Sequence, residues 1–232
     1  MKFKRTSELT KGISKERVLG IVKESTPLLL ASSMMLMINW IDSLAIGYFG
    51  NETDVGIYTV LAKISNFISI ILISVDSIAA PKFAELFYKG EIQQLKNSVR
   101  KSTNLIFIAS FPMFLIIAVF REQILGLIGE EYVVGASALL FLLIGQLVNA
   151  LSGCAGSLLM VTGHQRTNQY IIFSALITQI ILNCVLVPLY GIKGAAISSM
   201  ISTSLWNLLG VYYVNKKLNI FTFFVPKFIS RE

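Results

Sequence analysis

The sequence Pro188-Leu-Tyr-Gly-Ile-Lys-Gly-Ala-Ala-Ile-Ser-Ser-Met-Ile-Ser202 joins two long apolar runs with almost no loop. Beyond the turn, Gly194, Ser198 and Ser202 recur at every fourth position, so their small side chains share one face of a helix. In a membrane, such a face lets a second helix approach closely. Pro188 and Gly191 favour a turn between the two runs. The pattern therefore predicts a tight hairpin of two membrane-spanning helices.

The composition of the whole chain is that of an integral membrane protein. The 232 residues are 54% hydrophobic and only 14% charged, and the mean hydropathy is +0.70. Ordinary soluble domains have about 25% charged residues. Apolar segments close to the roughly 20 residues that a helix needs to cross a bilayer lie at 27–49, 55–80, 104–120, 136–161, 170–189 and 194–214.

These segments predict an all-α fold, a six-helix transmembrane bundle over residues 26–218. An N-terminal segment, residues 1–25, and a tail, residues 219–232, flank it. Within the N-terminal segment, apolar residues between charges at 15–24 favour an interfacial amphipathic helix. The loop over residues 81–103 has the same character, which predicts a second helix lying along the membrane surface.

The basic residues are unevenly distributed over this topology. Every Lys and Arg except Lys63, Arg121 and Lys193 lies in the N-terminal segment, in the second or fourth loop, or after the last apolar segment, which ends at residue 214. These parts share one side of the membrane, and an excess of basic residues marks the cytoplasmic side. Both termini are therefore predicted to be cytoplasmic. The net charge of +7 then fits the anionic inner leaflet, and no nucleic-acid partner is expected.

Three stretches resemble the polysaccharide transporters of the multidrug/oligosaccharidyl-lipid/polysaccharide (MOP) superfamily, and the O-antigen flippases in particular. They are the pattern Pro-x-Tyr-Gly-Ile-x-Gly-Ala-Ala from Pro188, the segment from Ala79 to Glu91, and the segment from Asn39 to Tyr58. The resemblance extends over roughly residues 26–218. It covers only the second, C-terminal six-helix half of the family.

The resemblance implies a flippase, not an enzyme. Its expected substrate is an undecaprenyl-diphosphate-linked oligosaccharide unit of O-antigen, capsular or exopolysaccharide biosynthesis, moved across the bacterial cytoplasmic membrane. Transport would involve rocking of two helix bundles around a central cavity. A second six-helix half is therefore expected as a partner, either a separate chain or another copy of this one. No cofactor is expected beyond a coupling ion, H⁺ or Na⁺.

Three alternatives stay open at this point. The chain could be half of a drug or cation antiporter of the same superfamily. It could instead be an inactive truncated fragment or a scaffold, as the half length suggests. A membrane enzyme is the weakest alternative, because no loop holds a catalytic set, a nucleotide-binding motif or a metal-ligand spacing.

Asp42 and Lys63 are the main candidates for function. A charge inside the membrane is costly and usually faces a partner or a water-filled cavity. Both residues are expected roughly 10–12 Å below the outer surface on adjacent helices. They form either a structural ion pair or a substrate site, in which Lys63 binds the anionic sugar or diphosphate and Asp42 serves as its partner or as a cation site.

Polar uncharged residues form stripes on several of the predicted helices. Interhelical hydrogen bonding would explain any one stripe, whereas several together favour an internal hydrophilic path. The expected path residues are Asn39, Asn66, Gln146, Asn149 and Asn207.

Three further residues are secondary candidates. Asp76 lies near the inner end of the second segment and is expected to pair with a basic residue of the following loop. Arg121 is expected to snorkel at the outer interface. His164 lies in a short cytoplasmic loop and is a minor candidate for proton coupling; with no second histidine, no metal site is predicted.

Overall fold

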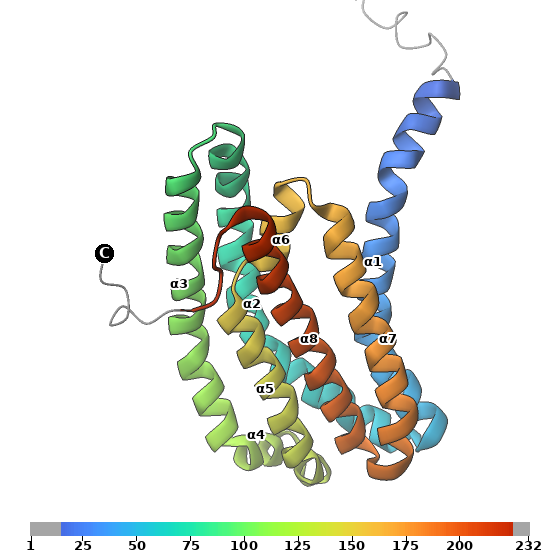
Figure 1. The fold of residues 1–232 in the computed structure, drawn as a ribbon. Coiled ribbons are helices and arrows are strands. Elements are labelled where there is room, and N and C mark those ends of the chain that lie inside the picture. The colour runs from blue at the N-terminus through green and yellow to red at the C-terminus, as the bar shows by residue number, and fades with distance from the viewer. Residues whose placement is uncertain (1–14, 225–232) are drawn as a thin grey trace, which may run out of the picture.

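The structure, a computed structural model, describes the backbone of residues 15–224 and the side chains of residues 29–30 and 32–224. All regular secondary structure in this part is helical, as predicted (Figure 1). The elements are α1 (Lys15–Phe49), α2 (Glu52–Tyr88), α3 (Ile92–Val119), α4 (Arg121–Ile128), the 3-10 helix η1 (Glu130–Gly135), α5 (Ala136–Ser152), α6 (Ala155–Val161), α7 (Gln165–Tyr190) and α8 (Ile192–Leu218). Residues 1–14 and 225–232 lie outside the described part.

The predicted hairpin is formed by α7 and α8. Gly194, Ser198 and Ser202 are all buried, and the Ser202 hydroxyl donates a 2.8 Å hydrogen bond to the Ala175 carbonyl of α7. A Cβ atom at Gly194 would collide with the backbone of Leu186. The small residues thus permit the close approach of the two helices.

The end of α7 differs from the expectation. Pro188 lies inside the last turn of α7, and the helix ends only at Tyr190. Proline lacks the backbone N–H donor, and its ring crowds the carbonyl group four residues earlier; the helix nevertheless continues for two residues beyond it. Gly191, with φ of 54°, makes the reversal into α8. The helix therefore ends at a positive φ, which glycine adopts without steric cost.

The helices pack around two groups of buried apolar side chains. The first group joins α1, α2 and α5 near the end that holds α4, with Leu61, Leu139 and Leu143 fully buried. The second joins α2, α3, α6 and α8 near the opposite end, with Phe83, Leu95 and Leu158 fully buried. In Figure 1, α8 lies between α5 and α7, while α1 and α3 lie at opposite edges of the bundle.

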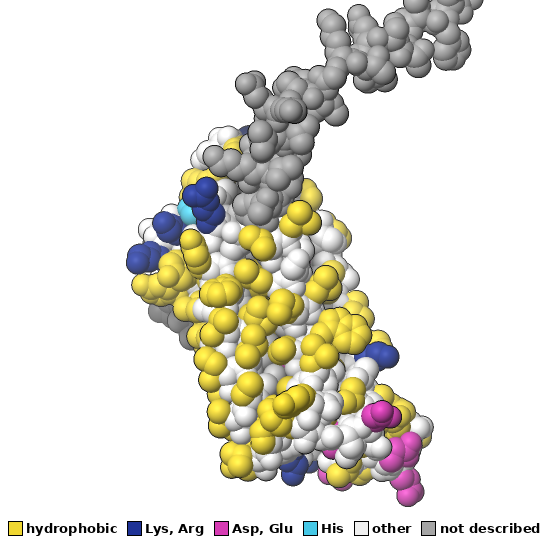
Figure 2. All heavy atoms as spheres, turned by 90° about the vertical axis from the view of Figure 1, so that its right-hand side faces the viewer, with side chains coloured by type: hydrophobic (Ala, Val, Ile, Leu, Met, Phe, Trp, Pro, Cys, Tyr) yellow, Lys and Arg dark blue, Asp and Glu magenta, His cyan; other side chains and the backbone are white. Residues whose placement is uncertain are grey.

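The outer surface suits a lipid environment. Large side chains such as Leu115, Ile181 and Leu208 are exposed on it. Among the described residues, four helical segments are long and apolar enough to cross a membrane: Glu52–Tyr88, Ile92–Val119, Glu130–Ser152 and Gln165–Tyr190. In Figure 2, hydrophobic side chains cover the middle of the face shown, acidic ones gather at its lower end and several basic ones lie near its upper end. The number of six crossings stays a prediction.

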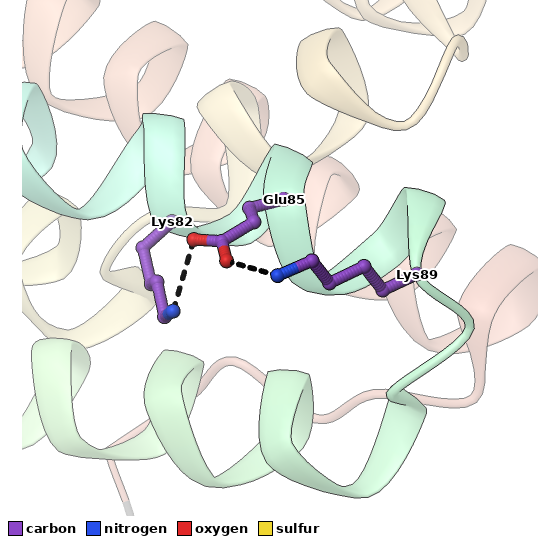
Figure 3. A network of polar contacts seen from close by, with 3 residues as sticks. All are labelled: Lys82, Glu85 and Lys89. Atoms are coloured by element: carbon purple, nitrogen blue, oxygen red, sulfur yellow. Dashed lines mark hydrogen bonds and ion pairs between the residues drawn. The ribbon is translucent and has the colours of Figure 1, made fainter.

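The prediction of a surface helix over residues 81–103 is wrong. The end of α2 and the start of α3 form one antiparallel hairpin that turns at residues 89–91. Phe83 and Leu86 of α2 are buried with Leu95 and Val99 of α3. The apolar face of this segment is therefore covered by the other arm of the hairpin. On its exposed side, Lys82 and Lys89 donate hydrogen bonds of 2.9 and 2.6 Å to Glu85 (Figure 3).

The apolar segment predicted over residues 136–161 is divided into α5 and α6. Gly153 joins them with φ of 59°. A Cβ atom at this position would collide with the side chain of Thr103 in α3. The break lets the short α6 leave the line of α5 and reach α2, and this arrangement shapes the site described below.

We predict that Gly194→Ala lowers the free energy of unfolding by about 1–3 kcal/mol, because its methyl group overpacks the contact with Leu186. The measurement is thermal unfolding of the purified chain in detergent. Gly56→Ala is the control, since this helical glycine has open space at its Cβ position. Equal melting temperatures for both variants would contradict the assigned packing.

Candidate functional site

A cavity of about 920 Å³ lies between α1, α2, α5, α6, α7 and α8. The structure brings every main candidate onto its wall, namely Asn39, Asp42, Lys63, Asn66, Gln146, Asn149 and Asn207. Asp76, a secondary candidate, lies there too. Arg121 and His164 do not line the cavity. What these side chains do remains a prediction, but their juxtaposition makes the cavity the candidate site.

Asp42 lies in a dense cluster of hydrogen bonds. Its side chain is buried, and its Oδ2 accepts a 2.6 Å bond from the Tyr58 hydroxyl. Its Oδ1 accepts bonds of 2.8 and 2.7 Å from the amide groups of Gln179 and Asn183. Charged groups accept the stronger hydrogen bonds in proteins, and these three donors together fix the carboxylate against α2 and α7.

The expected ion pair between Asp42 and Lys63 is not formed. The donors to Asp42 are neutral, and among the described residues Lys63 has neither an ion pair nor a hydrogen bond. The spacing along the two helices placed both residues at one depth but could not determine how each helix is rotated. Lys63 therefore faces the cavity with its charge uncompensated by these residues.

Amide side chains link α2 to α5 in the middle of the cavity. The Gln146 amide donates a 2.9 Å bond to Asn66, and its carbonyl accepts bonds of 2.6 Å from Ser69 and 3.2 Å from Asn149. The polar stripes had two interpretations, hydrogen bonding between helices and lining of a hydrophilic path. The same residues here form hydrogen bonds across helices and line the cavity.

Asp76 differs from the expectation. Among the described residues it has no basic partner, and its Oδ1 accepts a 2.6 Å bond from Ser157 of α6. The break at Gly153 explains this outcome, because it carries α6 against α2 at that level. The predicted pairing with a loop cation is therefore wrong.

The remaining candidates lie at the two ends of the bundle. Arg121, at the start of α4, donates a 2.8 Å bond to the Ala118 carbonyl, and its guanidinium lies 3.6 Å from Glu122. The His164 ring lies 3.2 Å from the Thr162 hydroxyl in the turn before α7. Among the described side chains, no three His, Cys, Asp or Glu residues gather as they would around a metal ion.

Sequence reasoning assigned no role to several residues of the site. Tyr58, Gln179 and Asn183 form the cluster at Asp42, and Ser157 contacts Asp76. Gln179 and Asn183 gave a usable signal, since residues four apart share a helix face. Tyr58 and Ser157 gave none, because a single tyrosine or serine in an apolar run has many ordinary packing roles.

Comparisons with known proteins agree on a transporter family. Residues 27–185 match the MatE family. The probable low-salt glycan biosynthesis flippase Agl15 of Haloferax volcanii is 23% identical over 183 residues, covering 78% of this chain and 39% of the flippase. The probable flippase AglR of the same archaeon is 25% identical, with 75% and 37% covered. An uncharacterized membrane protein of Methanocaldococcus jannaschii, MJ1375, is 29% identical, with 88% and 48% covered.

The fold also matches a solved structure. A MOP superfamily transporter from Pyrococcus furiosus, for which reverse polarity of the binding pocket suggests a different function, superposes with a TM-score of 0.62 and 16% identity. The match covers 91% of this chain and 48% of that transporter. The chain thus spans between about two fifths and one half of the length of these relatives. The expectation of a bundle resembling one half of a MOP transporter is confirmed.

We predict that Asp42→Ala lowers the free energy of unfolding by about 1–3 kcal/mol or more, because three buried donors lose their acceptor. Tyr58→Phe removes one of these bonds and should have a smaller effect. Tyr48→Phe is the control, since Tyr48 is exposed. Thermal unfolding in detergent checks the order, and an Asp42→Ala variant as stable as the control would contradict the cluster.

Proposed function

Since this chain belongs to the MatE family, we propose that it forms one half of a flippase that moves a lipid-linked oligosaccharide across the cytoplasmic membrane. The observation that carries the proposal is the large cavity, lined by apolar and polar side chains together, onto which Lys63 presents an uncompensated charge. The similarity to the probable glycan biosynthesis flippase Agl15 supports the substrate class, and the similarity to the probable flippase AglR supports the transport activity. The finer assignment, to undecaprenyl-diphosphate-linked units of O-antigen, capsular or exopolysaccharide synthesis in a bacterium, rests on the sequence resemblance.

In this proposal Lys63 binds the diphosphate or an acidic sugar. The unpaired ammonium group of Lys63 attracts an anion, and water would screen this attraction less once a second bundle encloses the cavity. The amide groups of Asn39, Asn66 and Gln146 offer donors and acceptors to sugar hydroxyl groups along the wall. Such bonds are weak enough individually to be exchanged as a substrate moves.

Asp42 is the proposed site of the coupling ion, H⁺ or Na⁺. The Gln179 and Asn183 side chains turn their amide groups to the carboxylate, and their carbonyl oxygens have no hydrogen-bond partner. A carboxylate with neighbouring carbonyl oxygens is a chemically suitable set for a proton or a hard cation. Release of the donors from Asp42 would accompany binding of the ion.

A second six-helix bundle is the proposed partner. Asn39, Lys63 and Asn66 line the cavity and are nevertheless exposed, so this wall is open on one side. Polar groups facing lipid are costly, and a second bundle over the opening would enclose them. The bundle could belong to the same polypeptide, to a separate chain or to another copy of this chain.

A drug or cation antiporter of the same superfamily is the second candidate. Two carboxylates on the cavity wall, Asp42 and Asp76, favour a cationic substrate. Uptake of a cationic dye into vesicles would support this function. Accumulation of lipid-linked glycan in the inner leaflet after deletion of the gene would support the flippase.

We predict that Lys63→Ala in the complete transporter lowers glycan export by roughly ten- to hundredfold, the value of a lost hydrogen bond to a charged group. The measurement is the amount of surface glycan in a deletion strain that expresses each variant at equal membrane level. Lys193→Ala is the matched control, because Lys193 is exposed and away from the cavity. Unchanged export by the Lys63 variant would refute the role of this residue.

We also predict that the basic end of the bundle is cytoplasmic. In a chain with Cys154 and Cys184 replaced by Ala, a membrane-impermeant maleimide should label Thr53→Cys in intact cells. It should label Gln93→Cys only after permeabilisation. Both positions are exposed: Thr53 lies at the start of α2, and Gln93 lies at the start of α3, just after the turn at the other end of α2. The reverse labelling pattern would mean that the termini lie outside.

A further inference from the structure

The cavity has two ends of different chemistry. Lys63 and Asp76 lie thirteen positions apart on α2, which corresponds to about 20 Å along the helix axis. Both line the cavity. The end near Lys63 carries this unpaired lysine and the buried, hydrogen-bonded carboxylate of Asp42, whereas at the opposite end Asp76 is the one charged residue among those that line the cavity. A substrate that spans the cavity therefore meets two distinct subsites.

The end near Asp76 combines groups from four helices. Asp76 of α2 accepts the bond from Ser157 of α6. Asn168 of α7 and Asn207 of α8 lie on the same wall. Gly210 of α8 lies against Ala155 at the start of α6, where a Cβ atom would make an ordinary van der Waals contact of 3.4 Å. Trp206, one turn before Gly210 on the same helix face, lines the cavity.

The end near Asp76 has free capacity for hydrogen bonds. A carboxylate accepts about four such bonds, and Ser157, together with the thiol of Cys154, uses only part of this capacity. Asn168 gives an independent indication. Its side chain is 7% exposed, its Oδ1 has no hydrogen-bond partner, and a Cβ atom on Gly156, another lining residue, would lie 3.8 Å away. A buried acceptor without a partner is relieved when a ligand donates to it.

The indole of Trp206 adds a flat apolar surface with a polar edge. It is half-buried and lines the cavity beside Asn207. A sugar ring has the complementary form: one face is covered by C–H groups, and the edge carries hydroxyl groups. An aromatic ring holds the face, while carboxylate and amide groups bond to the edge. A lone carboxylate among neutral groups, with Asp76 the single acidic member, fits hydroxyl groups better than it fits a metal cation.

We propose that Asp76, Ser157, Asn168, Trp206 and Asn207 form a carbohydrate subsite that holds a neutral sugar ring of the substrate, while Lys63 holds the phosphate. The inference rests on the proposed flippase function and assigns the two parts of the substrate to opposite ends of one cavity. It also makes the sugar, and not only the anionic group, a determinant of binding.

The test compares two ligands on the full chain in lipid nanodiscs. One is a prenyl diphosphate that carries N,N′-diacetylchitobiose, and the other is the same prenyl diphosphate without sugar. Binding is followed by the fluorescence of Trp206 in a Trp40→Phe background, since the chain has 2 tryptophans. For the Trp206 variants, which lack this reporter, binding is measured with ligands labelled on the prenyl chain.

The glycosylated ligand should bind more tightly than the bare diphosphate. Asp76→Asn and Trp206→Ala should weaken the glycosylated ligand by roughly tenfold or more and leave the bare diphosphate unchanged, whereas Lys63→Ala should weaken both. Trp206→Phe, which keeps an aromatic face, should retain part of the difference. Trp40→Ala is the matched control, because Trp40 is 64% exposed and lies off the cavity.

Several outcomes would overturn the subsite. The first is equal affinity of the wild-type chain for the two ligands, and the second is equal weakening of both ligands by Asp76→Asn. The third is that Asp76→Asn specifically abolishes binding of an organic cation such as tetraphenylphosphonium. Circular dichroism of each variant separates loss of binding from loss of folding. Asp76→Asn and Trp206→Phe change the size of the side chain little, so they test binding even if Trp206→Ala does not fold. If the wild-type chain binds neither prenyl diphosphate, the proposed flippase function fails instead.

Discussion

Asp42 shows the constraint under which the whole bundle is built. In hydrocarbon, a polar group without a partner costs several kcal/mol, so each polar side chain must bond to another helix or face water. Here the carboxylate draws donors from α2 and α7 together. The same requirement links Gln146 of α5 to Asn66 of α2 and Ser157 of α6 to Asp76. Apolar side chains cover the outside, and the polar ones gather around one cavity.

The shape of that cavity depends on small residues at particular points. Gly194 allows α8 to contact the backbone of α7, and Gly153 ends α5 with a positive φ. Gly194 holds the α7 and α8 walls of the cavity close together. Gly153 turns α6 toward α2 and brings Ser157 to Asp76. Neither glycine contributes a functional group, yet both determine which functional groups meet.

Charge is distributed unequally along the cavity, and this gives it a direction. Lys63 lies on the part of α2 nearer the acidic end of the bundle, and Asp76 lies nearer the basic end. Between them the wall combines amide and hydroxyl groups with apolar side chains such as Phe67, Ile70 and Leu142. A molecule with an anionic part and a sugar part would be oriented by such a wall. A cavity of this kind suits an amphiphilic substrate that changes its contacts stepwise as it moves.

The helical class, the α7–α8 hairpin and the main candidate residues on the cavity could be predicted from the sequence, because hydrophobic length and the spacing of small or polar residues depend only on the helical repeat. The hydrogen-bond partners could not be predicted: Asp42 bonds to Tyr58, Gln179 and Asn183 and not to Lys63, and Asp76 bonds to Ser157 and not to a loop cation. The packing of α2 against α3, which covers the apolar face of residues 81–103, could not be predicted either. A periodic pattern gives the face of a helix, but the rotation of its neighbours and the breaks within them depend on packing between segments far apart in the chain.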